Sequence, residues 1–205
     1  MDELIAALTQ AGRAVADAEL RDAPAHVVEL RRTFRAPAGD LWDACTNPER
    51  VRRWFLPLSG DLRPGGTFQL EGNARGTITT CEPPRRLELT WQFGDAEPSL
   101  VSLELAPAGE DATELVLRHT VPDDDHWAQF GPGAVGVGWE GGLSGLAAFI
   151  AGEERSRDPQ SMATFMRRSA VLWGEAHEAA GASPDVAAEA AGRTSAFYAP
   201  AQQSH

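Results

Sequence analysis

The chain has 205 residues, enough for one domain with a sizeable core and appendages but short for two complete domains. Acidic residues outnumber basic residues 30 to 18, the formal net charge is −12, and every basic residue in this count is an arginine. No nucleic acid and no membrane is therefore expected as a partner, because both need a basic protein face that displaces counterions or meets headgroups.

The first part of the chain predicts a helix, a strand and two short helices. Residues 2–19 place apolar side chains at helical spacing, which predicts an amphipathic N-terminal helix. Residues 26–35 alternate between apolar and polar side chains, as a half-buried strand does, although Arg32 falls on the apolar face. Proline and asparagine-proline signals then delimit two short helices, over residues 37–47 and 49–55.

The middle of the chain predicts five further strands. Glycine and proline turn signals separate three of them, over residues 63–72, 74–84 and 85–93. Two more, over residues 99–106 and 113–120, are joined by a polar hairpin connection. Because apolar and polar side chains alternate regularly in these segments, we expect six antiparallel strands in all, with one face covered and the other in water.

Residues 132–150 combine apolar side chains at helical spacing with many glycines. Each glycine costs helix stability relative to alanine, so the glycines need a physical reason. A helix that lacks side chains on one face can press closely onto a sheet, or onto a molecule held between helix and sheet. We therefore predict a long helix that lies across the curved sheet and closes a cavity.

Two further helices are predicted in the tail. Asp158-Pro159 and Ser183-Pro184 are helix-start signals, and Gly181 between them is a helix-end signal. The first of these helices carries an apolar stripe that would be a liability if exposed, so we expect the tail to dock on the protein or on a second copy of it, as a homodimer. The expected organisation is an N-terminal helical extension over residues 1–24, a main domain over 25–152 and a C-terminal helical extension over 153–205.

A family resemblance rests on four segments in this order: FRAPAGDLWDACTNPERVRRWF, LRPGGTFQLEG, CEPPRRLELTWQF and GVGWEGGLSGLAAFI. Together they resemble the START-like, or SRPBCC, superfamily, and within it the broad bacterial branch similar to the activator of heat-shock-protein-ninety ATPase homologue. The resemblance covers roughly residues 25–152. It implies an α+β helix-grip (Bet v-like) fold, in which a six-stranded antiparallel sheet wraps round a long C-terminal helix. It also implies a deep cavity, which in various members holds lipids, hormones, polyketides or aromatic substrates. Arg75 stands where a small residue is expected, so the turn or the cavity mouth departs from the pattern there.

The candidate ligand-binding residues are those expected on the covered face of the sheet, on the second short helix and on the long helix. Small-molecule sites are mostly apolar with a few polar groups, although each aromatic residue here could equally be ordinary core. His119 shares strand parity with Leu115 and Leu117, so it is expected on the covered face, either as a ligand contact or as a satisfied core histidine. The set is Trp54, Phe55, Phe68, Thr77, Trp91, Leu103, His119, Trp139 and Leu143, with Arg32 as a further polar candidate.

The remaining motifs do not predict metal or catalytic chemistry. The residues 123–126, DDDH, are of metal-ligand type, but consecutive residues in one loop rarely converge on one ion, so a solvated loop is expected. Cys45 and Cys81 are too few for a disulfide framework and lack CxxC spacing, so we expect unbridged thiols. Glu140 is the carboxylate of the long helix and is expected on its exposed surface. Because no nucleophile, zinc-protease or nucleotide-binding motif occurs, no catalytic residue, cofactor or metal is predicted.

Three functions from different classes remain open. The preferred one is binding of a small apolar or aromatic ligand in a cavity between the sheet and the long helix. An enzyme of the cyclase or hydrolase kind, acting on a hydrophobic small molecule, would also need a polar pair within hydrogen-bond reach. A chaperone-associated, ATPase-activator-like module would use its surface. No segment approaches the ~20 apolar residues of a membrane span, and residues 1–10 lack the apolar stretch of an export signal, so we expect a cytoplasmic protein.

Overall fold

The computed structural model describes residues 8–153 and 158–200, which form two compact units. Unit 1 contains the described residues of Met1–Leu30, Val121–Ser144 and Ser156–His205, and unit 2 contains those of Arg31–Thr120 and Gly145–Arg155. Each unit is thus assembled from segments that are far apart in the sequence. The expected organisation into residues 1–24, 25–152 and 153–205 stays a prediction.

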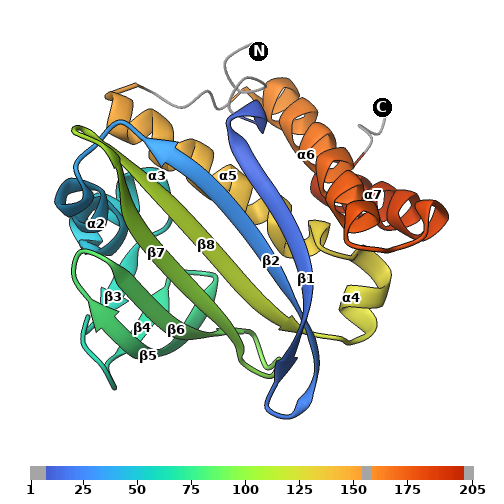
Figure 1. Cartoon of the computed structure of the whole chain (residues 1–205), viewed down its shortest axis with the longest axis horizontal. Helices are drawn as coiled ribbons and strands as arrows, with labels where there is room; N and C mark the ends of the chain where they lie inside the picture. The colour runs from blue at the N-terminus through green and yellow to red at the C-terminus, as the bar shows by residue number, and fades with distance from the viewer. Residues whose placement is uncertain (1–7, 154–157, 201–205) are drawn as a thin grey trace. The chain divides into compact units, whose positions relative to one another are not determined.

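One antiparallel sheet runs through the described residues, with eight strands in the order β1-β2-β8-β7-β6-β5-β4-β3 (Figure 1). The strands are β1 (Ala11–Leu20), β2 (Ala23–Phe34), β3 (Leu58–Gly60), β4 (Thr67–Leu70), β5 (Ala74–Glu82), β6 (Arg86–Phe93), β7 (Ser99–Gly109) and β8 (Ala112–Pro122). Six strands were expected, and the two additional ones, β1 and β3, are the edges of the sheet. From β3 to β8, neighbouring strands in this order follow one another in the chain, because short hairpin connections join them.

The helix expected over residues 2–19 is wrong from Ala11 onward, where the chain forms strand β1, and its residues 2–7 lie outside the described residues. The sequence AGRAVADAEL is rich in alanine, which favours a helix, but pairing with the next strand overrides that preference. Arg21 and Asp22 connect β1 to β2 with positive φ angles of 53° and 62°. A two-residue turn with positive φ at both residues matches the right-handed twist of the strands it joins, so β1 and β2 form a hairpin.

All the described helices except α4 lie close to their predicted positions. They are α2 (Ala38–Thr46), α3 (Pro48–Trp54), α4 (Asp125–Phe130), α5 (Gly133–Ala151), α6 (Pro159–Ala179) and α7 (Pro184–Tyr198). Both predicted tail caps are confirmed, since the Asp158 side chain accepts a hydrogen bond from Ser161 N and that of Ser183 accepts one from Val186 N. Helix α4 was not expected, and Asp124 caps its first turn by accepting from Trp127 N.

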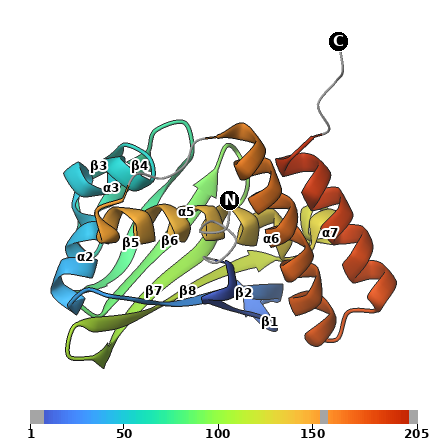
Figure 2. The same ribbon diagram turned by 90° about the horizontal axis from the view of Figure 1, so that it is seen from above.

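Unit 2 has a helix-grip arrangement of its own elements. Its strands curve round the last turns of α5, with α2 and α3 beside them (Figure 2). Helix α3 contacts the edge strand β3, and α2 contacts β7. The inner face of this sheet is apolar, with Leu105, Leu115 and Leu117 buried as the alternation predicted. Burial of this face against helices is the main source of stability for such a layer.

Unit 1 packs the tail helices against the first half of α5. A methyl group at Gly136 would collide with the buried indole ring of Trp173, and one at Gly133 would lie 2.8 Å from the Thr194 side chain. The α5 glycines were expected to allow close approach of the sheet. That expectation is wrong for Gly133 and Gly136, which instead allow close approach of α7 and α6. Tail docking on the protein is confirmed within this unit, where α6 contacts both β1 and α7. A homodimer through the terminal helices stays a prediction.

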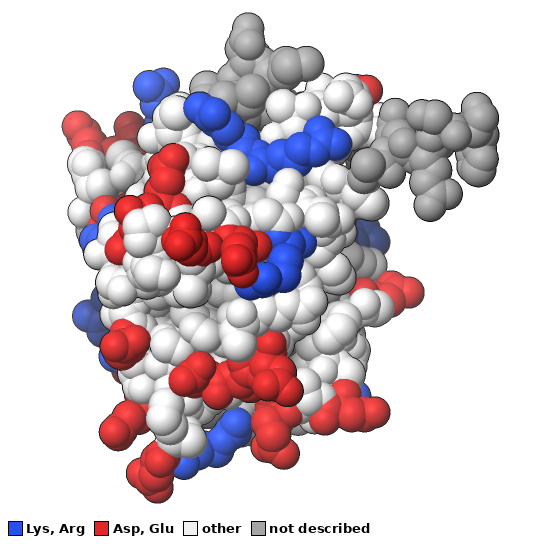
Figure 3. Space-filling model, turned by 90° about the vertical axis from the view of Figure 1, so that its right-hand side faces the viewer, with Lys and Arg blue, Asp and Glu red and all other residues white. Residues whose placement is uncertain are grey.

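Charge on the face that carries α6 and α7 is mixed. Figure 3 shows this face, with carboxylates spread over its middle and lower parts and arginines concentrated in its upper part. Some of these charges pair on the helices themselves, as Arg193 does with Glu189 at 3.2 Å. Positive and negative side chains are therefore unevenly distributed over this face.

Helix α5 has a property that the sequence analysis missed. It is the one helix among the described residues that is long and apolar enough to cross a membrane, with a mean hydropathy of 1.3 over its best window. The expectation that no segment approaches a membrane span is therefore wrong in terms of length and composition. A buried core helix has the same properties, so the finding gives only weak support for a membrane.

Candidate functional site

Three ring side chains predicted as site residues lie in a row on one face of the unit 2 sheet. Phe68 and Trp91 have ring centroids 6.2 Å apart, and Trp91 and His119 have centroids 6.1 Å apart. These three residues, from β4, β6 and β8, are called the aromatic row below. The register explains their common face, because Val101 on β7 pairs with both Leu89 on β6 and His119 on β8.

Gly76 on β5 makes the contact between Phe68 and Trp91 possible. It pairs directly with Phe68, and a Cβ at Gly76 would lie 2.8 Å from the Phe68 ring. The same Cβ would also collide with the backbone carbonyl of Thr90. Because glycine leaves this space open, the Phe68 ring can lie over β5 and reach the neighbour of β5.

Ser99 completes the row with a polar pair that sequence reasoning missed. It stands opposite Trp91 in the β6–β7 register, and its Oγ lies 2.7 Å from His119 Nε2 and 3.0 Å from the Trp91 carbonyl oxygen. When the hydroxyl donates to that carbonyl, Oγ accepts from Nε2–H, which fixes the tautomer of the ring. Ser99 could have been predicted as a partner of His119 only from the register of β6, β7 and β8, because that register brings the two residues together in space.

Burial controls the charge of His119. Only 3% of the residue is exposed, and desolvation lowers its pKa from 6.5 to about 3. The imidazole is therefore neutral at physiological pH. A base with so low a pKa activates a hydroxyl poorly near neutrality, because general-base catalysis works best when the pKa lies near the operating pH. The pair is thus better suited to hydrogen bonding than to nucleophilic catalysis.

The other predicted site residues fall in different places. Leu103 pairs with Leu87 and Leu117 on the same face as the aromatic row and is half-buried. Thr77 pairs with Thr67, so the register places it on the opposite face from Phe68, and it does not join the row. Trp139 and Leu143 belong to the part of α5 in unit 1, where Trp139 is half-buried and Leu143 is buried.

Trp54 and Phe55 lie at the end of α3 as a stacked pair with centroids 5.5 Å apart. The indole N–H of Trp54 donates to the Ala44 carbonyl on α2 at 2.9 Å. Both aromatic side chains are half-buried. On β2, the further polar candidate Arg32 is buried, with its guanidinium 5.6 Å from the Phe34 ring centroid. Their membership of a binding site stays a prediction, whereas the members of the aromatic row contact one another directly.

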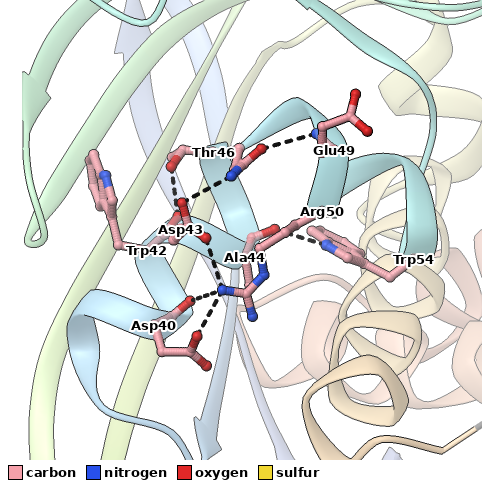
Figure 4. A network of polar contacts seen from close by, with 9 residues as sticks. Asp40, Trp42, Asp43, Ala44, Thr46, Glu49, Arg50 and Trp54 are labelled. Carbon is pink, nitrogen blue, oxygen red and sulfur yellow. Dashed lines mark hydrogen bonds and ion pairs between the residues drawn. The ribbon is translucent and has the colours of Figure 1, made fainter.

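An ion-pair network connects α2 to α3 (Figure 4). Arg50 on α3 donates to Asp40 Oδ1 at 2.7 Å and to Asp43 Oδ2 at 2.9 Å. Hydrogen bonds from Arg50 and Asn47 hold the pKa of Asp43 below its usual value, and the two aspartates raise the pKa of Arg50. The guanidinium groups of Arg50 and Arg53 lie 5.3 and 4.8 Å from the centroid of the Phe149 ring, near the end of α5.

Unit 1 contains a separate buried polar cluster around Glu140. This residue was expected on an exposed helix surface, but only 3% of it is exposed. Its carboxylate accepts hydrogen bonds from Arg13 on β1 and from Ser169 on α6. Burial raises the pKa of Glu140, and the Arg13 charge and the hydrogen bonds oppose that shift. The hydrogen bonds of this carboxylate link β1, α5 and α6.

A second cluster in unit 1 surrounds Trp127 of α4. His26 stacks on its indole ring with centroids 4.0 Å apart, and His177 meets the same ring edge-on at 5.6 Å. The His26 ring nitrogens lie 3.3 Å from Asp17 and 3.4 Å from Asp123. The loop expected over residues 123–126 is therefore wrong from Asp125 onward, where α4 begins, while Asp123 faces a histidine and Asp124 caps that helix. Among the described residues, no group of three or more histidine, cysteine or carboxylate side chains could hold a metal ion.

The two cysteines are free, which confirms the prediction of unbridged thiols. Burial raises the pKa of Cys45 to about 12, and it also raises that of Cys81. Because the thiolate is the reactive form, neither position is prepared for nucleophilic chemistry.

An antiparallel sheet that curves round the end of a long helix, with two short helices inserted after one of its strands, is the helix-grip architecture of the START-like superfamily. Within that superfamily, the chain belongs to the family described as "Activator of Hsp90 ATPase homolog 1-like protein", whose model matches residues 35–151. Both the superfamily and the branch expected from the sequence are confirmed. No curated protein matches the chain.

Three solved structures illustrate the range of relatives. CalU16 from Micromonospora echinospora is 35% identical with a TM-score of 0.70, and the match covers 82% of this chain and 98% of that chain. DynU16, a protein in the dynemicin biosynthetic locus, is 26% identical with a TM-score of 0.53, over 61% of this chain and 47% of that chain. An HSP90 activator from Plasmodium falciparum is 23% identical with a TM-score of 0.54, over 63% and 99% of the two chains, and shows likeness of fold alone.

Proposed function

We propose that this protein binds a small apolar or aromatic ligand against the inner face of the unit 2 sheet. The observation that carries the proposal is the aromatic row together with the Ser99–His119 pair. The row offers flat apolar surfaces, and the pair offers neutral hydrogen-bonding groups on the same face. A mostly apolar surface with a few polar groups is the usual composition of a small-molecule site.

The half-buried state of Trp91 supports the proposal. Phe68 and His119 are buried, but Trp91 between them keeps part of its surface accessible. Aromatic faces stack on other rings with centroids 4.5–7 Å apart, so an incoming ring can add to this row in the same way that its members contact one another. We extend the proposed site along the same face to Leu103, and we propose that the stacked pair at the end of α3 borders it.

The relatives give limited support that agrees with this proposal. DynU16 is described as a protein in a biosynthetic locus, which is a setting for small molecules. Its match to this chain is 26% identical and covers less than half of that protein, so we take from it the kind of ligand and not its identity. The family name refers to a chaperone ATPase activator, and the solved activator among the relatives supports only a common fold.

A second candidate function, a cyclase- or hydrolase-like reaction, is favoured by one observation, the 2.7 Å contact between Ser99 and His119. It is the polar pair within hydrogen-bond reach that such an enzyme would need. Two features weigh against it. Burial lowers the pKa of His119 to about 3, and Ser99 is buried in a strand rather than placed on an exposed turn between a strand and a helix.

The proposal is tested by titrating the full chain with a panel of small apolar and aromatic compounds while following tryptophan fluorescence. We expect saturable quenching by at least one compound, without its conversion to product. Trp91→Ala should weaken that binding about tenfold or more, since ~1–3 kcal/mol is typical of a stacking contact. Thr77→Ala is the matched control, because Thr77 lies on the opposite face of the same sheet and should leave the affinity unchanged.

Turnover of a quenching compound that is abolished by Ser99→Ala would favour the enzymatic alternative. Equal affinity in the Trp91→Ala variant and the wild type would place binding elsewhere on the protein and refute the proposed site.

A further inference from the structure

Helix α3 concentrates positive charge on an acidic protein. Three of its seven residues, PERVRRW, are arginines, whereas the whole chain has a net charge of −12. A net negative protein repels anionic ligands, and a local group of positive charges can reverse that effect at one place on its surface. The three arginines do not contribute equally to such a place, because their partners differ.

Two of the three arginines are already neutralised. Arg50 is held by the carboxylates of Asp40 and Asp43, and Arg52 pairs with Glu49 on the same helix at 2.7 Å. Arg53 has no carboxylate partner among the described residues. Its guanidinium lies over the Phe149 ring at 4.8 Å, and its side chain is otherwise exposed. Arg53 therefore keeps its hydrogen-bond donors available to an external acceptor.

Arg53 also lies next to the proposed ligand site. It directly precedes the stacked pair Trp54 and Phe55, and α3 contacts β3. Strand β3 pairs with β4, which carries Phe68 of the aromatic row. The guanidinium groups of both Arg50 and Arg53 lie over the Phe149 ring, which connects α3 to the end of α5. An exposed cation thus stands at the border of half-buried aromatic surface.

We propose that Arg53 binds the carboxylate of an amphipathic ligand whose apolar or aromatic body lies against the inner face of the unit 2 sheet. This inference rests on the proposed function and names the ligand class as aromatic or aliphatic carboxylic acids. Arginine suits the role because its planar guanidinium donates two parallel hydrogen bonds to a carboxylate while its face stacks on an aromatic ring. The Phe149 ring already holds the guanidinium in a stacked position, which reduces the entropy lost on binding.

The test compares two probes of nearly equal shape, 2-naphthoate and 2-naphthamide, by isothermal titration calorimetry with the full chain at pH 7.5. We expect the wild type to bind the naphthoate more tightly by roughly five- to tenfold, a modest value for a charge-assisted hydrogen bond at an exposed position. Arg53→Gln should abolish this difference by weakening naphthoate binding only. Arg52→Gln is the matched control on the same helix, since Arg52 is already paired with Glu49, and it should retain the difference.

The results distinguish failure of the Arg53 contact from failure of ligand binding at the aromatic row. Binding of both probes with equal affinity, or an unchanged preference for naphthoate in Arg53→Gln, would overturn the role of Arg53 and leave the proposed function standing. Loss of the preference in Arg52→Gln as well would show a general field of α3 rather than a specific contact, and would also overturn it. Absence of binding by either probe would count against the proposed function and the inference together.

Discussion

Each of the two units buries a titratable side chain among aromatic neighbours, yet the two clusters are built differently. In unit 1, Glu140 is hydrogen-bonded to Arg13 and Ser169, and the nearby Trp173 is fully buried in a notch made by Gly136. In unit 2, His119 is kept neutral, contacts Ser99, and adjoins Trp91, which remains half-exposed. A cluster whose hydrogen bonds tie three elements together stabilises the fold, whereas one with accessible aromatic surface can receive a ligand.

This difference makes the more charged cluster the poorer place for a ligand to bind. A buried ion pair that loses one partner is costly, because the remaining charge has no compensation. Any ligand that displaced Arg13 or Ser169 from Glu140 would meet this cost. A ligand that stacks on Trp91 displaces only water from an apolar surface, which is favourable.

The largest contrast is expected between two tryptophans. Trp173→Ala should lower the free energy of unfolding by ~3–5 kcal/mol, because it empties a fully buried position in a close-packed notch. Trp91→Ala should cause a clearly smaller loss of unfolding free energy than Trp173→Ala, since part of the Trp91 ring is already in water. Urea unfolding followed by circular dichroism measures both values. Equal losses in the two variants would mean that Trp91 is ordinary core.

The Glu140 cluster gives the next largest effect. Glu140→Ala should cost about 3 kcal/mol, because it leaves the Arg13 guanidinium buried without its carboxylate. The double variant Arg13→Leu with Glu140→Leu should recover most of that loss, since it removes both charges and keeps apolar volume. A double-mutant cycle by chemical denaturation supplies the comparison. A double variant as unstable as the single one would show that the ion pair itself stabilises unit 1.

The two titratable groups should give opposite pH dependences. The lowered pKa of His119 means that the native state binds fewer protons than the unfolded chain between about pH 3 and pH 6.5. Its contribution to stability is therefore complete above pH 6.5 and is lost as the pH falls, by up to ~1.4 kcal/mol per pH unit. The raised pKa of Glu140 gives the opposite pH dependence. Its contribution to stability is present below about pH 4.5 and is lost as the pH rises through the raised pKa.

Thermal unfolding between pH 3 and pH 8 measures this dependence. His119→Gln should flatten the loss of stability below pH 6.5, because glutamine cannot take up a proton there. A variant that keeps the acid slope of the wild type would assign that slope to other groups.

The smallest effects come from two glycines in helices of unit 1. Gly192→Ala in α7 should raise stability by ~0.5–1 kcal/mol, because alanine is the better helix former and nothing lies within 4 Å of the added methyl group. Gly136→Ala should lower stability in spite of the same helix preference, since the methyl group meets the Trp173 ring. Melting temperatures of the two variants should move in opposite directions. A shift in the same direction for both would show that the notch is not close-packed.

The sequence predicted those elements whose signals are local. Regular alternation located β5 to β8, and the pairs Asp158-Pro159 and Ser183-Pro184 located the starts of α6 and α7. Strand β1 was missed because its alanine-rich sequence favours a helix in isolation, and its partner strand provides the hydrogen bonds that decide otherwise. The connecting residues Arg21 and Asp22 lack the glycine that would have indicated a hairpin.

The candidate site was predictable in part for the same reason. Strand parity placed His119 and Trp91 on the covered face, and the structure brings both together with Phe68. Ser99 and the Glu140 cluster were not predictable, because each depends on partners at least 20 residues away in the chain. Thr77 was placed on the wrong face because its parity depends on the register between β4 and β5, and turn residues alone do not determine that register.

The central claim, that unit 2 holds a small apolar or aromatic molecule at the aromatic row, is tested most directly by native mass spectrometry of freshly purified protein. Wild-type chain, Trp91→Ala and Thr77→Ala would be purified identically and then incubated with the compound that quenches tryptophan fluorescence most strongly. We expect a bound mass in the wild type and in Thr77→Ala, and its loss or strong reduction in Trp91→Ala. Wild-type protein that carries no small molecule after purification and takes up none on incubation would contradict the claim.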